Sequence, residues 1–438
     1  MTQRDALDLL KLGYNIYLGG SAGSGKTYLL KKYIQYLKHN KVGIGITAST
    51  GIAATHLNGR TIHSWCGMGI KNTLTQADIR ALLDKPYLKS NFLKTKVLII
   101  DEISMLHVYQ LEMVDMICKA FKQNDLPFGG LQVVLCGDFF QLPPVSKNGE
   151  DNKFVYESQI WKDMDIRICY LHEQHRQEDK IFLKVLSDIR TNSVTEETKQ
   201  ILLRRYNQQV DGKIIPTKLY THNVDADSIN NTELGKIEEK PQIYKTESKG
   251  IEIMVEVLKK NCLAPEILIL KKGAAVMFVK NNFDKGYVNG TLGKVIGFDK
   301  NDYPVVETYD KRRIIASPEK WTIEENNEQL AEIIQIPLRL AWAITVHKSQ
   351  GMSLDSAQID LSKTFEYGMG YVALSRVRRL NGIKLMGIND RAFQINSEIV
   401  ELDKKLIDLS KQEEVKLSKL RWWTKWVRQK YFLKKIKS

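Results

Sequence analysis

The segment from Gly20 to Thr27 constrains the fold of this chain more than any other. It lies between a short apolar run at 16–18 and a helix-compatible stretch at 28–37, and it reads Gly20-Ser21-Ala22-Gly23-Ser24-Gly25-Lys26-Thr27. Such a turn points backbone N–H groups at a phosphate, and the following helix adds the positive end of its dipole. Lys26 supplies a charge, and the Thr27 hydroxyl can bind Mg2+. The segment therefore predicts a nucleoside-triphosphate site; the alternative is a turn that only connects a strand to a helix.

Short apolar and β-branched runs alternate with helical stretches in two parts of the chain. They occur at 16–18, 43–47, 97–100 and 133–136, and again at 218–220, 338–343, 357–359 and 383–385. Strands that alternate with helices indicate parallel sheets, and open parallel sheets bind ligands at the carboxyl ends of their strands. The sequence therefore predicts an α/β protein with two such lobes.

Between the two series, from about residue 225 to 321, short strands are separated by glycines, which predicts a small β-barrel. Within it, Asn289-Gly290 predicts a tight hairpin, because this dipeptide readily adopts positive φ at both turn positions.

Asp101 and Glu102 directly follow the apolar run at 97–100. In a nucleotide site, Asp101 can hold a hydrated Mg2+ while Glu102 polarises the attacking water. A solvated acidic pair is the alternative, but a buried strand leading into the pair disfavours it. Together with the phosphate loop, the pair predicts an ATPase that uses Mg2+.

The block at 137–145 ends the strand at 133–136 and places Gln141 where it can sense the terminal phosphate. With these residues the chain resembles superfamily-one helicases, more closely the Pif (petite integration frequency) family of superfamily 1B, and is also similar to RecD-like and Dda-like helicases. Further segments match the motifs of the Pif family in the family's order, at 47–54, 59–64, 111–134, 173–177, 341–353 and 371–377.

The resemblance implies an ATP-dependent DNA helicase that moves 5' to 3' on single-stranded DNA and unwinds duplexes. We expect a monomer to be the acting unit. Forks, G-quadruplexes and RNA:DNA hybrids are the implied substrates, in replication, repair, recombination or telomere maintenance. An ATP-switched nucleic-acid clamp or remodeller, which binds strands without stepping along them, is the alternative from another class.

The same resemblance implies RecA-like lobes with two insertions. The first lobe is expected at 1–65 and 97–165, with a wedge at 66–96 that separates strands. The second lobe is expected at 166–224 and 333–400, and it carries an inserted SH3-like barrel at 225–332. A C-terminal tail follows at 401–438.

The motifs also imply site residues. Arg176 and Arg376 are expected to reach the triphosphate as arginine fingers when the lobes close, with a structural ion pair as the alternative for each. Gln3 is expected to read the adenine edge, unless it is an ordinary surface glutamine, and Gly351 to contact the nucleotide. The expected DNA track comprises Thr47, Thr50, Gly51, His63, Ser64, Phe140, Thr345, His347 and Lys348. Phe140 can stack on a base in this track or pack in the core.

The charge of the chain favours a polyanionic partner. Its 65 Lys and Arg residues against 51 Asp and Glu give a net charge of +14, and the 12 basic and five acidic residues of the tail supply half of it. The tail interleaves these basic residues with aromatic ones, which suits single-stranded nucleic acid or an acidic protein. Leu402, Leu406 and Leu409 instead favour an amphipathic helix on the body for its first half. No apolar run is long enough to span a membrane, and we expect a cytoplasmic protein.

Overall fold

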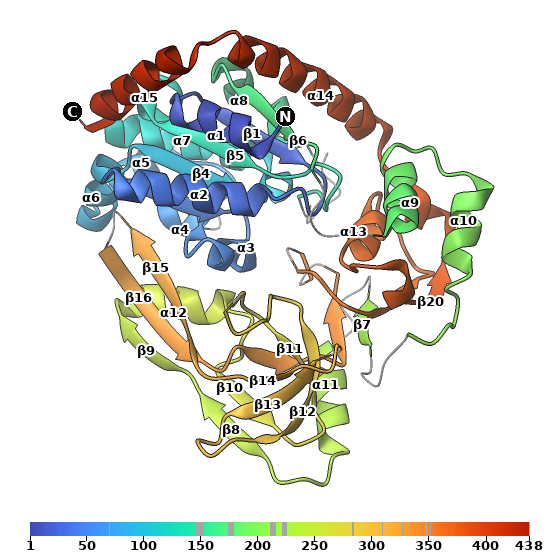
Figure 1. Ribbon diagram of the computed structural model, residues 1–438. Helices are drawn as coiled ribbons and strands as arrows, with labels where there is room; N and C mark the ends of the chain where they lie inside the picture. Colours follow the sequence, from blue (N-terminus) through green and yellow to red (C-terminus); the bar gives the residue numbers. More distant parts are fainter. Residues whose placement is uncertain are drawn as a thin grey trace.

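The computed structural model of the chain comprises two α/β lobes, an inserted β-rich module and two C-terminal helices (Figure 1). It describes residues 1–69, 71–144, 153–173, 179–210, 216–220, 226–282, 284–308, 310–325, 328–346, 349–350 and 352–437. The expected α/β class is confirmed, because each lobe is built on a parallel sheet.

The first lobe contains a six-stranded parallel sheet in the order β3-β2-β4-β5-β1-β6. Its strands are β1 (Ile16–Gly20), β2 (Ile44–Ala48), β3 (Arg60–Thr61), β4 (Val97–Asp101), β5 (Gln132–Cys136) and β6 (Arg167–Leu171). Strands β1, β2, β4 and β5 are buried at every residue, because helices cover both faces of the sheet.

Alternate residues of β4 show which helices cover each face. Val97 and Ile99 pack with α1 (Gln3–Lys11) and α2 (Lys26–His39). Leu98 and Ile100 pack with helices of the opposite face. That face carries α4 (Ile62–Cys66), α5 (Gln76–Leu83), α6 (Pro86–Lys94), α7 (Val108–Lys122) and α8 (Gln159–Asp163). The segment expected to form a wedge is thus the helical pair α5 and α6, which packs on α7.

The second lobe contains a four-stranded parallel sheet in the order β18-β7-β19-β20. Its strands are β7 (Thr217–Tyr220), β18 (Ala343–Thr345), β19 (Ala357–Leu361) and β20 (Ile383–Ile388). Its helices are α9 (Lys180–Arg190), α10 (Glu196–Leu203), α11 (Ala226–Gly235) and α13 (Met369–Ser375). Helix α9 begins where the Asp179 carboxylate accepts hydrogen bonds from the N–H groups of Ile181 and Phe182.

The inserted module consists of three antiparallel sheets and one helix. A five-stranded sheet has the order β14-β13-β12-β11-β17, and two smaller sheets are β15-β16-β9 and β10-β8. The elements are β8 (Gln242–Lys245), β9 (Glu247–Gly250), α12 (Glu252–Asn261), β10 (Ile267–Leu270), β11 (Ala275–Phe278), β12 (Leu292–Phe298), β13 (Pro304–Thr308), β14 (Arg313–Ile315), β15 (Glu319–Glu325), β16 (Glu328–Gln335) and β17 (Leu338–Leu340).

Three expectations about these elements were wrong. Strand β6 pairs with β1, so the first sheet extends beyond the boundary predicted at residue 165. The run predicted as one strand at 338–343 is divided, because β17 pairs with β11 of the module whereas β18 pairs with β7 of the second lobe. In the Asn289-Gly290 turn only Gly290 has positive φ, and the N–H of Thr291 donates to the carbonyl of Val288, as in a type II turn.

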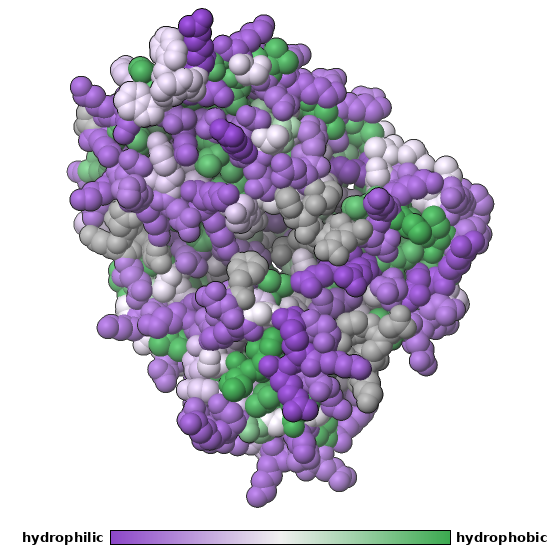
Figure 2. Space-filling model, in the orientation of Figure 1, coloured by the Kyte–Doolittle hydropathy of each residue, from purple (hydrophilic) through white to green (hydrophobic). Residues whose placement is uncertain are grey.

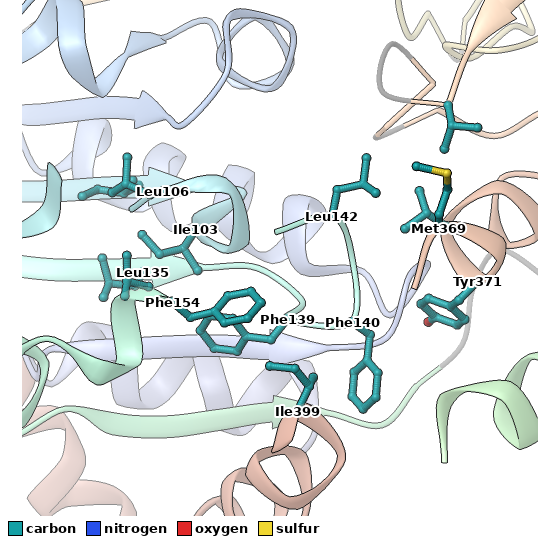
Figure 3. Close-up of a cluster of buried hydrophobic side chains, with 14 of the residues drawn as sticks. Ile103, Leu106, Leu135, Phe139, Phe140, Leu142, Phe154, Met369, Tyr371 and Ile399 are labelled. Carbon is teal, nitrogen blue, oxygen red and sulfur yellow. The ribbon is translucent and has the colours of Figure 1, made fainter. Parts of the chain in front are cut away.

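The C-terminal residues form two helices that return to the first lobe. Helix α14 (Ser397–Ser418) leaves the second lobe and packs on β6, where the Ser410 hydroxyl accepts a hydrogen bond from the N–H of Tyr170. Helix α15 (Trp422–Lys437) then lies against α1 (Figure 1). The two lobes and helix α14 also share a buried hydrophobic cluster. It includes Phe140 after β5, Tyr371 on α13 and Ile399 on α14 (Figure 3).

Candidate nucleotide site and nucleic-acid interface

The phosphate loop joins the end of β1 to the first residue of α2. Gly20, Gly23 and Gly25 have φ values of +144°, +89° and +85°, which glycine adopts more readily than other residues. A Cβ atom at Gly20 would lie 2.8 Å from the carbonyl oxygen of Leu171. No side chain caps the N-terminus of α2, so its first N–H groups remain available to an anion.

Lys26 lies over the base of this loop. Its ammonium donates to the carbonyl oxygens of Gly20 (2.7 Å) and Ser21 (3.0 Å). Both contacts lie at the entrance to α2, where a phosphate also gains from the helix dipole. The lysine is therefore placed to exchange carbonyl contacts for a phosphate oxygen.

A cleft of about 520 Å3 opens beside the loop and is lined by both lobes and the inserted module. The first lobe contributes the predicted residues Ala22, Gly23, Ser24, Gly25, Lys26, Thr27, Asp101, Glu102 and Gln141. The second lobe contributes Arg376, a buried residue at the end of α13. The structure therefore brings Lys26 and Arg376 to one cleft, and their contact with a triphosphate stays a prediction.

Several polar atoms in this cleft are buried without a partner. Within the described part of the chain, Ser24 Oγ, Glu102 Oε2, Gln141 Oε1 and Asn289 Oδ1 have no hydrogen-bond partner. Burying such atoms costs about 1–3 kcal/mol each unless a bound molecule satisfies them. Four of them around one cleft fit a polar ligand better than a packing defect.

Asp101 and Glu102 form an acidic pair, in which Asp101 at the end of β4 is buried and Glu102 directly after it is partly buried with its Oε2 atom enclosed. Glu102 has φ +51°, an uncommon value for a residue other than glycine, and the Ser49 hydroxyl donates to its carbonyl oxygen. Burial raises the pKa of both carboxyl groups, and the charge of Asp101 raises the pKa of Glu102 further, whereas Lys26 opposes both shifts. Two such carboxylates next to the Thr27 hydroxyl are an oxygen donor set that suits Mg2+.

Arg376 is held by its own helix. Its guanidinium donates to the carbonyl oxygen of Val372 (3.0 Å) and to the Ser375 hydroxyl (2.9 Å). Burial lowers the pKa of Arg376, and the charge of Glu102 in the first lobe opposes that shift. The arginine therefore faces the acidic pair across the boundary between the lobes.

The structure adds residues that sequence reasoning missed. His56, Asn281, Asn289, Arg378 and Arg379 also line the cleft. The Asn289 amide donates to His56 Nε2 (2.9 Å), and burial lowers the pKa of His56 to about 4, which keeps its imidazole neutral. The Asn-Gly dipeptide predicted a turn, but no sequence signal indicated that this turn reaches the nucleotide site.

One further predicted nucleotide residue lies away from the cleft, and two are not described by the structure. Gln3 is the first residue of α1 and does not line the cleft, so its adenine contact stays a prediction. Arg176 and Gly351 lie outside the described residues, as do His347 and Lys348 of the expected DNA track.

Part of the expected DNA track lies on two short helices after β2 and β3. Thr50 caps α3 (Gly51–His56) by accepting a hydrogen bond from the N–H of Ala53, and His63 and Ser64 lie on α4. His63 Nε2 is 2.9 Å from the Gln110 amide nitrogen, and burial lowers the pKa of His63. These residues remain partly exposed, and α12 and β15 of the inserted module contact α3.

Three members of the track are buried in this structure. Thr47 is fully buried, and its hydroxyl donates to the carbonyl oxygen of Ile99 within the sheet. Phe140 is 3% exposed, and the Arg190 guanidinium covers one face of its ring at 3.7 Å from the ring centre. Thr345, at the end of β18, is also buried. Of the two alternatives that the sequence left open for Phe140, base stacking and core packing, its burial favours core packing.

The fold and the cleft define a class of protein, a P-loop ATPase with its nucleotide site between two RecA-like lobes. The comparisons with known proteins give the family within this class. The family described as PIF1-like helicase matches residues 2–200, and the 2B domain of DNA helicase Pif1 matches residues 254–298.

An ATP-dependent DNA helicase Pif1 from Psychrobacter is 46% identical over 94% of this chain and 71% of its own length. The chain spans 62% of the length of the Xenopus laevis relative, which is 36% identical. It therefore belongs to the Pif1 family of ATP-dependent DNA helicases, which confirms the expected family and enzyme class.

Two states of a solved relative differ in their similarity to this chain. Unliganded Pif1 from Bacteroides, 32% identical, has a TM-score of 0.78 over 92% of this chain and 95% of that one. The Bacteroides complex with ADP-AlF3 and single-stranded DNA, 31% identical, has a TM-score of 0.61 over 93% and 96%. The Bacteroides complex with ADP-AlF4 has a TM-score of 0.77, so this chain resembles the unliganded and the ADP-AlF4 structures more closely than the complex that contains single-stranded DNA.

Proposed function

We propose that this protein uses ATP hydrolysis to move 5' to 3' along single-stranded DNA and to unwind duplexes ahead of it. The observation that carries the proposal is the cleft between the lobes, where partnerless buried polar atoms of the phosphate loop, the acidic pair and Gln141 surround space beside Arg376. The related Bacteroides protein has been solved with ADP-AlF3 and single-stranded DNA, which supports both ligands.

Each residue of the cleft has a distinct role in the proposed reaction. Lys26 and the N-terminus of α2 bind the phosphates, and ionised Glu102 orients the attacking water and accepts its proton. Thr27 and Asp101 would hold Mg2+, which neutralises phosphate charge when bound. Gln141 and Arg376 stabilise the charge that develops on the terminal phosphoryl group.

Movement follows from the two-lobed construction of the site. Arg376 belongs to the second lobe and Lys26 to the first, so a triphosphate that both contact favours a closed arrangement of the lobes. Melting costs about 1.4 kcal/mol per base-pair step on average, so a small displacement per ATP suffices. We propose forked DNA, G-quadruplexes and RNA:DNA hybrids as substrates and a monomer as the acting unit.

Stopped-flow translocation on single strands tests the proposal. With a fluorophore at the 3' end, the time to the signal should lengthen with strand length, and with a fluorophore at the 5' end it should not. A signal that is independent of strand length with the fluorophore at the 3' end as well as at the 5' end would replace the motor with an ATP-switched clamp.

A further inference from the structure

We propose that the outer face of α15 is a second binding site for single-stranded DNA, separate from the cleft and from the track on α3 and α4. The proposal rests on three properties of this helix, namely a fixed position, exposed aromatic rings and a charge of one sign. It does not depend on the direction in which the motor moves.

The inner face of α15 fixes the helix to the first lobe. Phe432 and Leu433 are buried, and a Cβ atom at Gly13 would lie 2.2 Å from the Phe432 ring, so the ring packs directly on the backbone after α1. Lys425 forms an ion pair with Asp8 of α1 (3.5 Å). The helix is therefore held by its apolar residues, and its opposite side remains available for a partner.

The outer face exposes large aromatic rings. Trp422 is 80% exposed, Trp426 55% and Tyr431 69%, and Trp423 is half exposed beside them. The Lys430 ammonium lies 5.8 Å from the centre of the Trp426 ring. A soluble protein seldom leaves several aromatic side chains together in water unless they bind something.

The charge of this segment selects the partner. Nine Lys and Arg residues and no Asp or Glu follow Glu414. The region of α15 in Figure 1 is covered mostly by purple and near-white side chains in Figure 2. A polyanion with flat apolar groups satisfies both the cations and the rings, which describes single-stranded nucleic acid.

Other polyanionic surfaces fit less well. In duplex DNA the bases are stacked on each other and offer no face to a tryptophan. A helix that lies in a membrane surface turns its apolar side outward, whereas α15 turns Phe432 and Leu433 inward against α1. An acidic protein would satisfy the cations but gives no specific reason for the aromatic rings.

The position of α15 indicates which segment of DNA it can bind. In Figure 1 it lies on the side of the first lobe away from the inserted module, whereas α3 faces the module. A strand on α15 is therefore a different segment from the strand in the track. When a helicase separates a duplex, the displaced strand and the part of the tracked strand that trails the motor are both single-stranded. Either one supplies a second segment of DNA that can bind to α15.

Tryptophan fluorescence of the full-length protein tests the site directly. Outside α15 the other tryptophans are Trp65, Trp321 and Trp342, which are buried, and Trp161, which is partly buried. Stacked thymines should therefore quench mainly the α15 signal when oligo(dT) is titrated. The triple variant Trp422→Ala/Trp423→Ala/Trp426→Ala should lose this quenching and bind long oligo(dT) about tenfold more weakly, with an unchanged melting temperature.

Charge gives an independent test. Each phosphate contact with a single strand adds about 0.7 to the size of the slope of log affinity against log salt. The variant Lys430→Gln/Lys434→Gln removes two cations and should therefore reduce that slope by about 1.4. Lys41→Gln/Lys162→Gln, which removes two exposed cations far from α15 in sequence, is the matched control and should leave the slope unchanged. DNA-stimulated ATPase at saturating short oligo(dT) should stay at the wild-type value in all three variants, because the track is intact.

The results separate this site from the motor. Wild-type protein without quenching, or tail variants with wild-type affinity and salt slope, would overturn the site while leaving the motor proposal intact. A wild-type protein whose ATPase is not stimulated by short oligo(dT) would instead count against the motor proposal. A blue shift with phosphatidylglycerol vesicles and none with oligo(dT) would replace DNA with a membrane surface.

Discussion

At the residue scale, the acidic pair is the most informative part of the cleft. Glu102 is partly buried and has positive φ, and its pKa is raised by desolvation of its carboxyl group and by the charge of Asp101. Only the ionised carboxylate can accept the proton of the attacking water. The same charge is costly to bury, so catalysis and stability place opposite demands on this residue.

Replacing Glu102 with Gln should separate these demands. A raised carboxyl pKa means that the folded state binds more protons than the unfolded state, so folding loses stability as pH rises through that pKa. Above pH 7, the free energy of unfolding of Glu102→Gln should therefore exceed that of wild type by about 1–3 kcal/mol, and the variant should unfold at a higher temperature. This difference in stability should shrink below pH 5. Calorimetry across pH 5–8 measures it, and a variant less stable at pH 8 would contradict the assigned burial.

The wild-type ATPase should show the kinetic counterpart. Its turnover should fall as pH is lowered through the raised pKa of Glu102, above the usual range of a carboxyl group, and Glu102→Gln should lose at least 100-fold at every pH. A profile flat from pH 5 to 8 would exclude Glu102 as the base.

Lys26→Ala tests the phosphate loop. Loss of the only side-chain cation of this loop should lower ATP turnover at least 100-fold, while DNA affinity measured by anisotropy stays within about threefold, because the track lies on other elements. Undiminished turnover would refute the assigned active site.

At the element scale, the Asn-Gly turn connects the inserted module to the nucleotide site. Gly290 has φ +94°, and a Cβ atom there would lie 2.3 Å from the carbonyl oxygen of Ser353 in the second lobe. Its neighbour Asn289 reaches across to His56 of the first lobe. The turn is thus one element through which the module contacts the cleft.

Gly290→Ala should disturb this contact more than a similar change elsewhere in the module. We expect it to cost about 2–4 kcal/mol of stability or to raise the KM for ATP several-fold, because backbone atoms must move. Gly297→Ala in β12 is the control, since a Cβ atom there would have no atom within 4 Å. Equal melting temperatures and KM values for the two variants would contradict the docking of the turn.

The elements also show what the sequence could predict. Asp101, Glu102 and Gln141 follow parallel strands, and such strands share one carboxyl edge, so their meeting with Lys26 was predictable. The pairing of β6 with β1 was not, because Arg167–Leu171 carries no motif and only tertiary pairing assigns it to a sheet. The burial of Thr47 and Phe140 was equally hidden, since their local motif does not reveal the Ile99 and Arg190 contacts.

At the scale of the whole molecule, Arg190 joins three parts of the chain. Its buried guanidinium pairs with Asp138 of the first lobe and Asp403 of α14, and it donates to the Tyr371 hydroxyl of α13. Burial opposes the charge of Arg190, but the neighbouring acidic groups raise its pKa overall. The lobes therefore meet around a fixed cation, and this cation does not line the nucleotide cleft.

Arg190→Met should destabilise the protein by about 3–5 kcal/mol, because it leaves the buried Asp138 carboxylate without its cation. Adding Asp138→Asn should restore part of this loss, as measured by urea unfolding of the full chain. A double variant no more stable than the Arg190→Met variant would show that the pair does not couple the lobes.

The composite ATP site is the central claim, and single-turnover unwinding of tailed duplexes tests it most directly. Wild-type protein should unwind a duplex with a 5' single-stranded tail and leave a duplex with only a 3' tail intact. Arg376→Ala should bind the 5'-tailed duplex but unwind it at least 100-fold more slowly, because the second lobe no longer reaches the phosphates. Unwinding only from a 3' tail, or a wild-type rate in Arg376→Ala, would contradict the account.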